Sequence, residues 1–191
     1  MPYRPRRLAL LILTFTLLLP GAASAAGGGL DPHPEGHGVA ESPATEEACG
    51  TTCAATPAAR LVDGEAIAPP GAPAGVQQVI AAANKIRTKP YLWGGGHGKW
   101  NDAGYDCSGA VSFALRGAKL LSTPLDSTSF ETWGAPGAGR WITVYSNPGH
   151  AYAVIAGLRF DTAGGADGPR WYSSTAAAAT GPFTARHPAG Y

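Results

Sequence analysis

One stretch of the sequence constrains the fold more than any other: residues 90–114, which read PYLWGGGHGKWNDAGYDCSGAVSFA. An aromatic segment and a glycine-rich loop precede Asp106-Cys107-Ser108-Gly109, which opens an apolar helix. The start of a helix carries unpaired backbone N–H groups and the positive end of the helix dipole, and both favour an anion. They raise the thiolate fraction of a cysteine placed there and can bind the oxyanion formed when it attacks an acyl carbon. The stretch therefore predicts a nucleophilic Cys107, with a buried structural cysteine as the alternative.

Composition divides the rest of the chain into two parts. Residues 26–75 contain nine Gly, seven Pro and twelve Ala but no Phe, Tyr or Trp. Such a segment buries too little apolar surface to offset the entropy lost on ordering it, so we expect a flexible linker. Residues 76–191 contain fifteen aromatic residues, including all five tryptophans, and have the length of one ordinary domain.

Residues 1–25 have the three parts of a secretory signal peptide. Three arginines precede an apolar run at residues 8–19, which is interrupted only by two threonines, and Ala23-Ser24-Ala25 offers a cleavage site. The run is shorter than the roughly twenty residues that a membrane-spanning helix needs. No cysteine follows it closely enough for a lipid anchor, because the first is Cys49. We therefore expect a secreted protein without a membrane anchor after cleavage.

Hydrophobic periodicity predicts helices first and strands later. Apolar residues recur at helical spacing over residues 75–88 and 107–120, and residues 122–139 predict a loop with a short helical turn. Segments typical of β-strands follow, separated by turn residues, at 141–145, 151–156, 158–161 and 183–186. This order predicts an α+β fold with N-terminal helices packed on a central antiparallel β-sheet.

The other two cysteines, Cys49 and Cys53, lie in the predicted linker. In an oxidising, exported setting they predict a small disulfide loop, which leaves Cys107 unpaired. A zinc site is the alternative, because the spacings of His33 and His37 with these cysteines resemble a two-His, two-Cys ligand set. Export disfavours the free thiolates that zinc requires, so the disulfide is the favoured reading.

His150 is the histidine best placed to act as the base for Cys107. It begins a strand directly after the turn Asn147-Pro148-Gly149, so the sheet is expected to hold its imidazole in place. Asp161 ends the next strand, and paired strands bring such positions side by side, where a carboxylate can orient an imidazole. The alternative is a capping histidine and a turn aspartate. His97 lies in the glycine loop near Cys107 and is expected to contact substrate.

Three blocks of the sequence resemble those of the NlpC-type (NlpC and p-sixty) cysteine peptidases of bacterial cell walls: Tyr91-Leu92-Trp93-Gly94-Gly95, Asp106-Cys107-Ser108-Gly109 and Gly149-His150. The resemblance covers about residues 76–165. It implies a papain-like domain that hydrolyses peptidoglycan stem peptides, typically between D-glutamate and diaminopimelate or lysine. It also implies Cys107 as nucleophile, His150 as general base and Asp161 in a third position that is often His in the family.

The same blocks supply the predicted substrate-binding residues. Together with His97 these are Tyr91, Trp93, Asp106 and Ser108. The chain departs from the family in two places. Gly139-Arg140-Trp141 stands where a Gly-Asp pair usually begins the strand before the histidine, and the hairpin to the third position is about one residue shorter.

The resemblance implies an enzyme that needs no metal and no organic cofactor and acts on peptidoglycan outside the cell or at the wall. The alternatives are a wall amidase of related papain-like fold and a domain that only binds wall peptides. Residues 76–191 have a net charge of +4, which is a weak indication of an anionic partner surface. The sequence has no Lys/Arg cluster and no stacking platform of the kind that nucleic-acid binding requires. We expect a monomer.

Overall fold

The computed structural model describes residues 56–164, 168–176 and 181–191. In chain order, the elements of these residues are β1 (Arg60–Val62), β2 (Glu65–Ile67), α1 (Ala74–Ile86), α2 (Cys107–Arg116), α3 (Ser127–Phe130), β3 (Ala135–Pro136), β4 (Ile142–Asn147), β5 (His150–Ile155), β6 (Leu158–Asp161), β7 (Arg170–Tyr172) and β8 (Thr184–His187). The predicted signal peptide, the Cys49–Cys53 disulfide and its zinc alternative lie outside the described residues.

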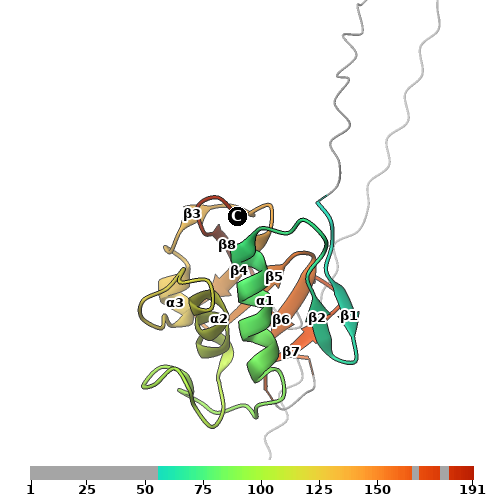
Figure 1. The fold of residues 1–191 in the computed structure, drawn as a ribbon. Helices are drawn as coiled ribbons and strands as arrows, with labels where there is room; N and C mark the ends of the chain where they lie inside the picture. The colour runs from blue at the N-terminus through green and yellow to red at the C-terminus, as the bar shows by residue number, and fades with distance from the viewer. Residues whose placement is uncertain (1–55, 165–167, 177–180) are drawn as a thin grey trace, which may run out of the picture. The chain divides into compact units, whose positions relative to one another are not determined.

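The described part of the chain has an antiparallel sheet covered by helices (Figure 1). Six strands lie in the order β3-β8-β4-β5-β6-β7, and every neighbouring pair is antiparallel. Helix α1 packs on α2, and α2 packs on β5 and β6. The predicted α+β class, with N-terminal helices on an antiparallel sheet, is confirmed.

The two long helices form where apolar periodicity predicts them. Helix α1 buries Val76, Val79 and Ile80 on one side, together with later residues at the same spacing. Helix α2 starts at the predicted Cys107 but ends at Arg116 rather than at residue 120. Its last turn tightens to i→i−3 hydrogen bonds, and Lys119 then adopts a left-handed φ of 59°, which stops the helix.

The pleat of the central strands separates the core from the face that carries ionisable side chains. Val144, Ala153 and Phe160 lie opposite one another on successive strands and are fully buried. Because side chains alternate along a strand, Arg159 and Asp161 of β6 project to the other face, which they share with His150 and Tyr152 of β5. The sheet therefore brings two charged residues and a histidine together.

The structure corrects the predicted boundary between linker and domain. Residues 60–67 form a two-stranded hairpin, not a flexible segment, and Ala59, Ala66 and Ala72 belong to the hydrophobic core. The Asn84 carboxamide accepts from Ala66 N at 3.1 Å and donates to Ala66 O at 3.0 Å. The absence of aromatic residues is a misleading criterion, since buried alanine methyl groups and the side chain of Asn84 hold this segment on α1. The folded part thus begins before residue 76.

The predicted strands match β4, β5, β6 and β8 to within about two residues at each end. Two short strands, β3 and β7, were not predicted. Strand β3 has two residues at the edge of the sheet, and one is Pro136. Strand β7 is placed by tertiary contacts of Trp171, whose ring lies 4.9 Å from that of Phe160 and whose Nε1 donates to Asn84 Oδ1 at 2.8 Å. Neither contact is visible in a local pattern.

Candidate active site

Cys107 is the first residue of α2 and lines a cavity of about 370 Å³. Its thiol is free and partly exposed. Asp106 precedes it as the N-cap, with an extended backbone and a carboxylate that accepts from Gly109 N at 2.7 Å. The helix start therefore presents the thiol to the cavity at the end of the helix that favours an anion.

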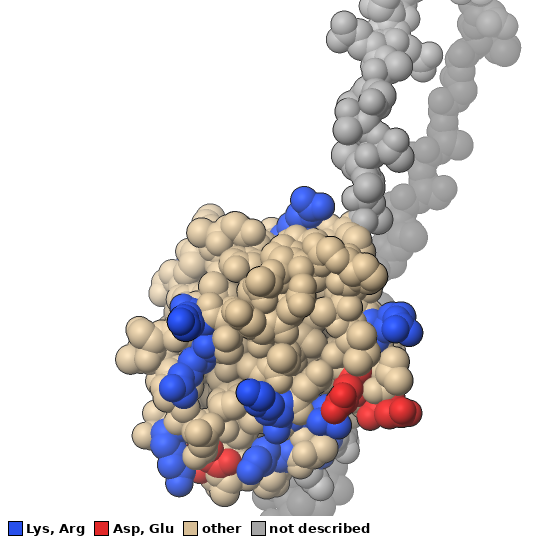
Figure 2. Space-filling model, viewed as in Figure 1, with Lys and Arg blue, Asp and Glu red and all other residues tan. Residues whose placement is uncertain are grey.

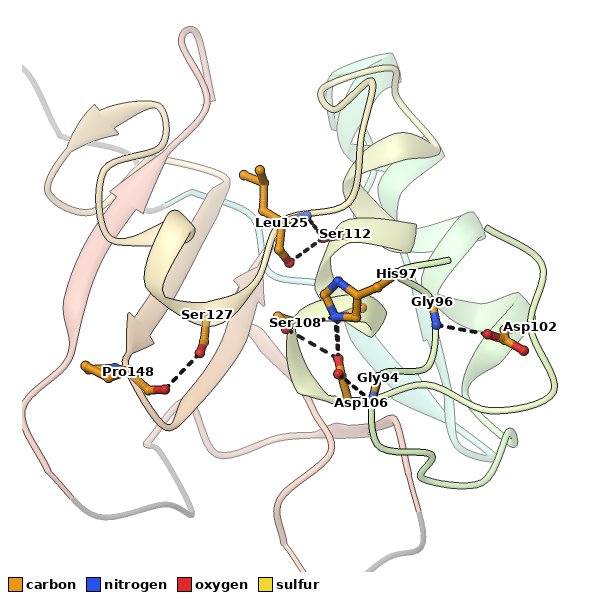
Figure 3. Close-up of polar contacts among 11 residues, drawn as sticks. Gly94, Gly96, His97, Asp102, Asp106, Ser108, Ser112, Leu125, Ser127 and Pro148 are labelled. Atoms are coloured by element: carbon orange, nitrogen blue, oxygen red, sulfur yellow. Dashed lines mark hydrogen bonds and ion pairs between the residues drawn. The ribbon is translucent and has the colours of Figure 1, made fainter. Parts of the chain in front are cut away.

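Asp106 also holds the glycine loop against this helix. Its Oδ2 accepts from Gly94 N at 3.1 Å, and its Oδ1 lies 3.0 Å from His97 Nε2 (Figure 3). Gly109 allows the close approach, because Gly95 O occupies the place where a Cβ on residue 109 would be. Both oxygens of this carboxylate are thus used within the protein, and Asp106 shapes the cavity more than it offers a free charge to a ligand.

All five residues predicted to bind substrate line the cavity with Cys107. They are Tyr91, Trp93, His97, Asp106 and Ser108. Trp93 is 87% exposed, and Ser108 Oγ donates to Asp106 Oδ1 at 3.3 Å. Burial raises the pKa of Tyr91, and the negative charges of Cys107 and Asp106 raise it further.

The structure also brings together His150 and Asp161. His150 begins β5 after the turn, and its Nε2 lies 2.8 Å from Asp161 Oδ1. The Asp161 side chain is fully buried, and its Oδ1 also accepts from Ala163 N at 2.9 Å. With Nε2 engaged by the carboxylate, Nδ1 is the ring nitrogen left for the thiol of Cys107.

The surroundings of His150 favour its protonated form. Burial lowers the pKa of His150, but its hydrogen bonds with Asp161 and Cys107 and the negative charges of both raise the pKa from 6.5 to about 9. An imidazolium next to a cysteine stabilises the thiolate. The three side chains can therefore hold a thiolate–imidazolium pair backed by a carboxylate.

Sequence reasoning missed one wall of the cavity, which comes from residues 126–128 and from Pro148 and Gly149. The buried hydroxyl of Ser112 in α2 donates to Leu125 O at 3.2 Å and accepts from Leu125 N at 3.0 Å, which anchors the segment. Ser127 Oγ then donates to Pro148 O at 3.2 Å, next to the turn that carries His150 (Figure 3). The pattern Asp126-Ser127 before a short apolar run signals a helix start, but it gives no indication of a cavity.

Two aromatic residues beside the imidazole were also missed as site residues. The rings of Tyr152 and Phe183 each lie 6.4 Å from that of His150, and they lie 5.2 Å from each other. Phe183 comes from the segment before β8, more than thirty residues along the chain. The two rings therefore flank the imidazole.

A larger cavity of about 490 Å³ lies between residues 56–58 and the β4–β5 face that carries Tyr145 and Tyr152. Its described lining has no cysteine, histidine or carboxylate. Chemistry, not size, therefore makes the cavity at Cys107 the candidate active site.

The described residues contain no cluster of three or more His, Cys, Asp or Glu side chains suited to a metal ion. None of the helices in the described ranges has the length and apolar composition required to span a membrane. On the face seen in Figure 2, Lys and Arg outnumber Asp and Glu, but they are spread over the surface.

Comparisons with known proteins give solved structures only: no family model and no curated protein matches the sequence. The P60 domain of an antigen from M. avium subspecies paratuberculosis is 21% identical, with a TM-score of 0.43 over 59% of this chain and 93% of that one. The peptidoglycan hydrolase RipB from Mycobacterium tuberculosis is 26% identical, with a TM-score of 0.45 over 59% of this chain and 64% of that one. The NlpC/p60 domain of the peptidoglycan hydrolase SagA is 21% identical, with a TM-score of 0.43, over 59% of this chain and 97% of that one. The P60 and NlpC/p60 domains carry the names of the family that the three sequence blocks resemble.

Proposed function

We propose that the chain is a secreted cysteine endopeptidase that hydrolyses peptidoglycan stem peptides through Cys107, His150 and Asp161. The observation that carries the proposal is the arrangement at the cavity: a free thiol at a helix start, and an imidazole that is bonded to a buried carboxylate and has a pKa raised in part by that thiol. Acyl transfer requires a nucleophile, a base that takes its proton, and an acceptor that orients the base. The three sequence blocks support peptidoglycan as the substrate.

In the proposed reaction the Cys107 thiolate attacks an amide carbonyl of the stem peptide. Gly109 N is occupied by Asp106 and Ala110 N by Asp106 O, so the Cys107 and Ser108 N–H groups at the helix start remain for the oxyanion. The His150 imidazolium then gives its proton to the leaving amine, and the C–N bond breaks to leave a thioester. Neutral His150 next takes a proton from the water that attacks the thioester, and the C–S bond breaks to release the Cys107 thiolate, which restores the thiolate–imidazolium pair.

The decisive experiment is digestion of purified peptidoglycan by the wild type and by Cys107→Ala, with mass spectrometry of the released fragments. We expect the wild type to release fragments with new D-glutamyl C-termini and Cys107→Ala to release none. The matched control is Cys49→Ser with Cys53→Ser, which removes the two other cysteines of the chain and should keep most of the activity.

Each other outcome identifies a different function. Fragments with a free lactyl-muramic acid end indicate an amidase with the same catalytic residues. Binding of stem peptide without cleavage by the wild type indicates a non-catalytic domain. Equal digestion by wild type and Cys107→Ala refutes the assignment of the nucleophile.

A further inference from the structure

Asp161 has a second charged neighbour besides His150. Arg159 precedes it by two residues on β6, projects to the same face of the sheet and is only 5% exposed. Its Nε lies 3.3 Å from Asp161 Oδ2, the oxygen that His150 does not use. Within the described ranges neither atom has a hydrogen-bond partner, and the two make no hydrogen bond with each other, so their contact is an ion pair between two buried groups.

The rest of the guanidinium group is held in place independently of Asp161. Arg159 Nη1 donates to Ala176 O, and the guanidinium carbon lies 4.4 Å from the centre of the Tyr172 ring. Arginine remains protonated at any pH that the fold tolerates. Arg159 is therefore a permanent, immobile positive charge beside a buried carboxylate.

A buried carboxylate needs compensation in every state of the reaction. While His150 is protonated, Asp161 has two positive neighbours. When His150 is neutral, as it is after protonating the leaving amine, Arg159 alone balances the charge. Without Arg159, the carboxylate would be uncompensated in that state, and the imidazolium would hold its proton more tightly.

We propose that Arg159 is a positioning residue for the reaction, acting through Asp161 to balance the charge of the carboxylate and to ease release of the proton from His150. This inference rests on the proposed function for its role in catalysis, but the charge balance itself exists without substrate. The active centre is thus a line of four side chains: Arg159, Asp161, His150 and Cys107.

The other groups that face this line do not replace Arg159. Burial and the charge of Asp161 raise the pKa of Tyr172, and burial, Tyr145 and Asp161 raise that of Tyr152 to about 12, so both hydroxyls stay neutral. Arg170 is the residue opposite Asp161 on β7, but its Nη1 donates to Arg87 O at 2.7 Å and to Pro169 O at 2.8 Å.

The test is an NMR titration of the His150 ring in the ¹⁵N-labelled full chain from pH 5 to 11. In the wild type we expect a midpoint near 9. Arg159→Met should raise the midpoint by about one unit, since a like charge near the imidazolium is lost. Arg159→Lys should stay close to the wild type. Asp161 Oδ1 keeps its bond from Ala163 N in these variants, so its direction toward His150 is retained.

Arg186→Met is the matched control, because this arginine of β8 donates to Glu131 O, away from Asp161, and its loss should leave the midpoint unchanged. If Arg159→Met does not fold, Arg159→Gln, which keeps a donor without the charge, should show the same rise. In the wild type itself, the Arg159 Nε–H signal should shift as His150 titrates, because both groups lie against one carboxylate.

The proposal is overturned if the His150 midpoint is unchanged or lower in the neutral variants, or if the Arg159 signal does not shift as His150 titrates. The titration needs no hydrolysis, so a failure of the proposed function leaves this test intact. Where hydrolysis is measurable, its alkaline limit should rise in Arg159→Met with the His150 midpoint.

Discussion

Asp161→Ala tests the electrostatic basis of the site most directly. The pKa of His150 is raised from 6.5 to about 9, which corresponds to about 3 kcal/mol in favour of the imidazolium. Asp161 supplies one of the two hydrogen bonds and one of the two charges that cause the rise, whereas burial opposes it. Its removal should lower the pKa of His150 by about two units.

The consequence for activity follows from the populations. At pH 8 a pKa near 9 leaves about nine-tenths of His150 protonated, and a value about two units lower leaves about one-tenth. The loss of the acceptor that aligns the ring should cost about tenfold more, so we expect turnover at pH 8 to fall by about a hundredfold. The thiolate–imidazolium pair is lost as pH rises through the pKa of His150. The pH at which activity falls on the alkaline side should therefore be lower in Asp161→Ala than in the wild type.

The assay is the pH profile of peptidoglycan hydrolysis, paired with the rate of Cys107 alkylation by iodoacetamide, which reports the thiolate without substrate. Asp161→Asn keeps the shape of the side chain without its charge, and Asp63→Asn, in the exposed β1–β2 turn, is the matched control for loss of an aspartate charge. Turnover above a third of wild type in Asp161→Ala, with an alkaline limit still near 9, would refute the reasoning.

Three further changes test the parts of the structure that support the site. Asn84→Ala removes three hydrogen bonds, two to Ala66 and one from Trp171, so urea unfolding should show a loss of about 2–3 kcal/mol at about 1 kcal/mol each; a loss below about 0.5 kcal/mol contradicts this. A chain that starts at residue 73 lacks the hairpin and the buried alanines before it, so calorimetry should show a lower Tm than for the mature chain. An equal Tm would show that residues 56–72 do not stabilise the domain. Ser112→Ala removes the two hydrogen bonds that anchor the wall at residues 126–128. Their loss can weaken substrate binding by about 1.4 kcal/mol, so KM should rise about tenfold at nearly unchanged kcat. A fall in kcat alone would show that Ser112 does not act through substrate binding.

The parts of the site that the sequence predicts are those set by local patterns. Cys107 follows a glycine loop and begins an amphipathic helix, and both features lie within a few residues of it. His150 and Asp161 mark the ends of adjacent strands joined by a tight turn, so strand alternation alone places them on one face. The structure describes all three where those patterns put them, although their catalytic roles stay predictions.

The parts that were missed depend on contacts between distant segments. The wall at residues 126–128 is held by Ser112, a serine that looks like any other residue of a helix until its partner Leu125 is known. Strand β7 is placed by the contact of the Trp171 ring with Phe160, and Phe183 reaches the site through its contact with Tyr152. The hairpin at residues 60–67 is not predicted by aromatic content, because small side chains, not aromatic ones, pack it against the core.

The proposed role of Arg159 bears on the predicted third position of this site, where the chain has an aspartate. A neutral side chain there, such as the histidine frequent in the resembling family, needs no counter-charge when the imidazole is deprotonated. A fully buried aspartate does need one, because burial penalises its charged form. The arginine two residues earlier on the same strand meets that need from a position that the pleat places on the same face. Asp161 and Arg159 are therefore best considered as one unit, in which the strand that supplies the carboxylate bonded to His150 also supplies the positive charge beside it.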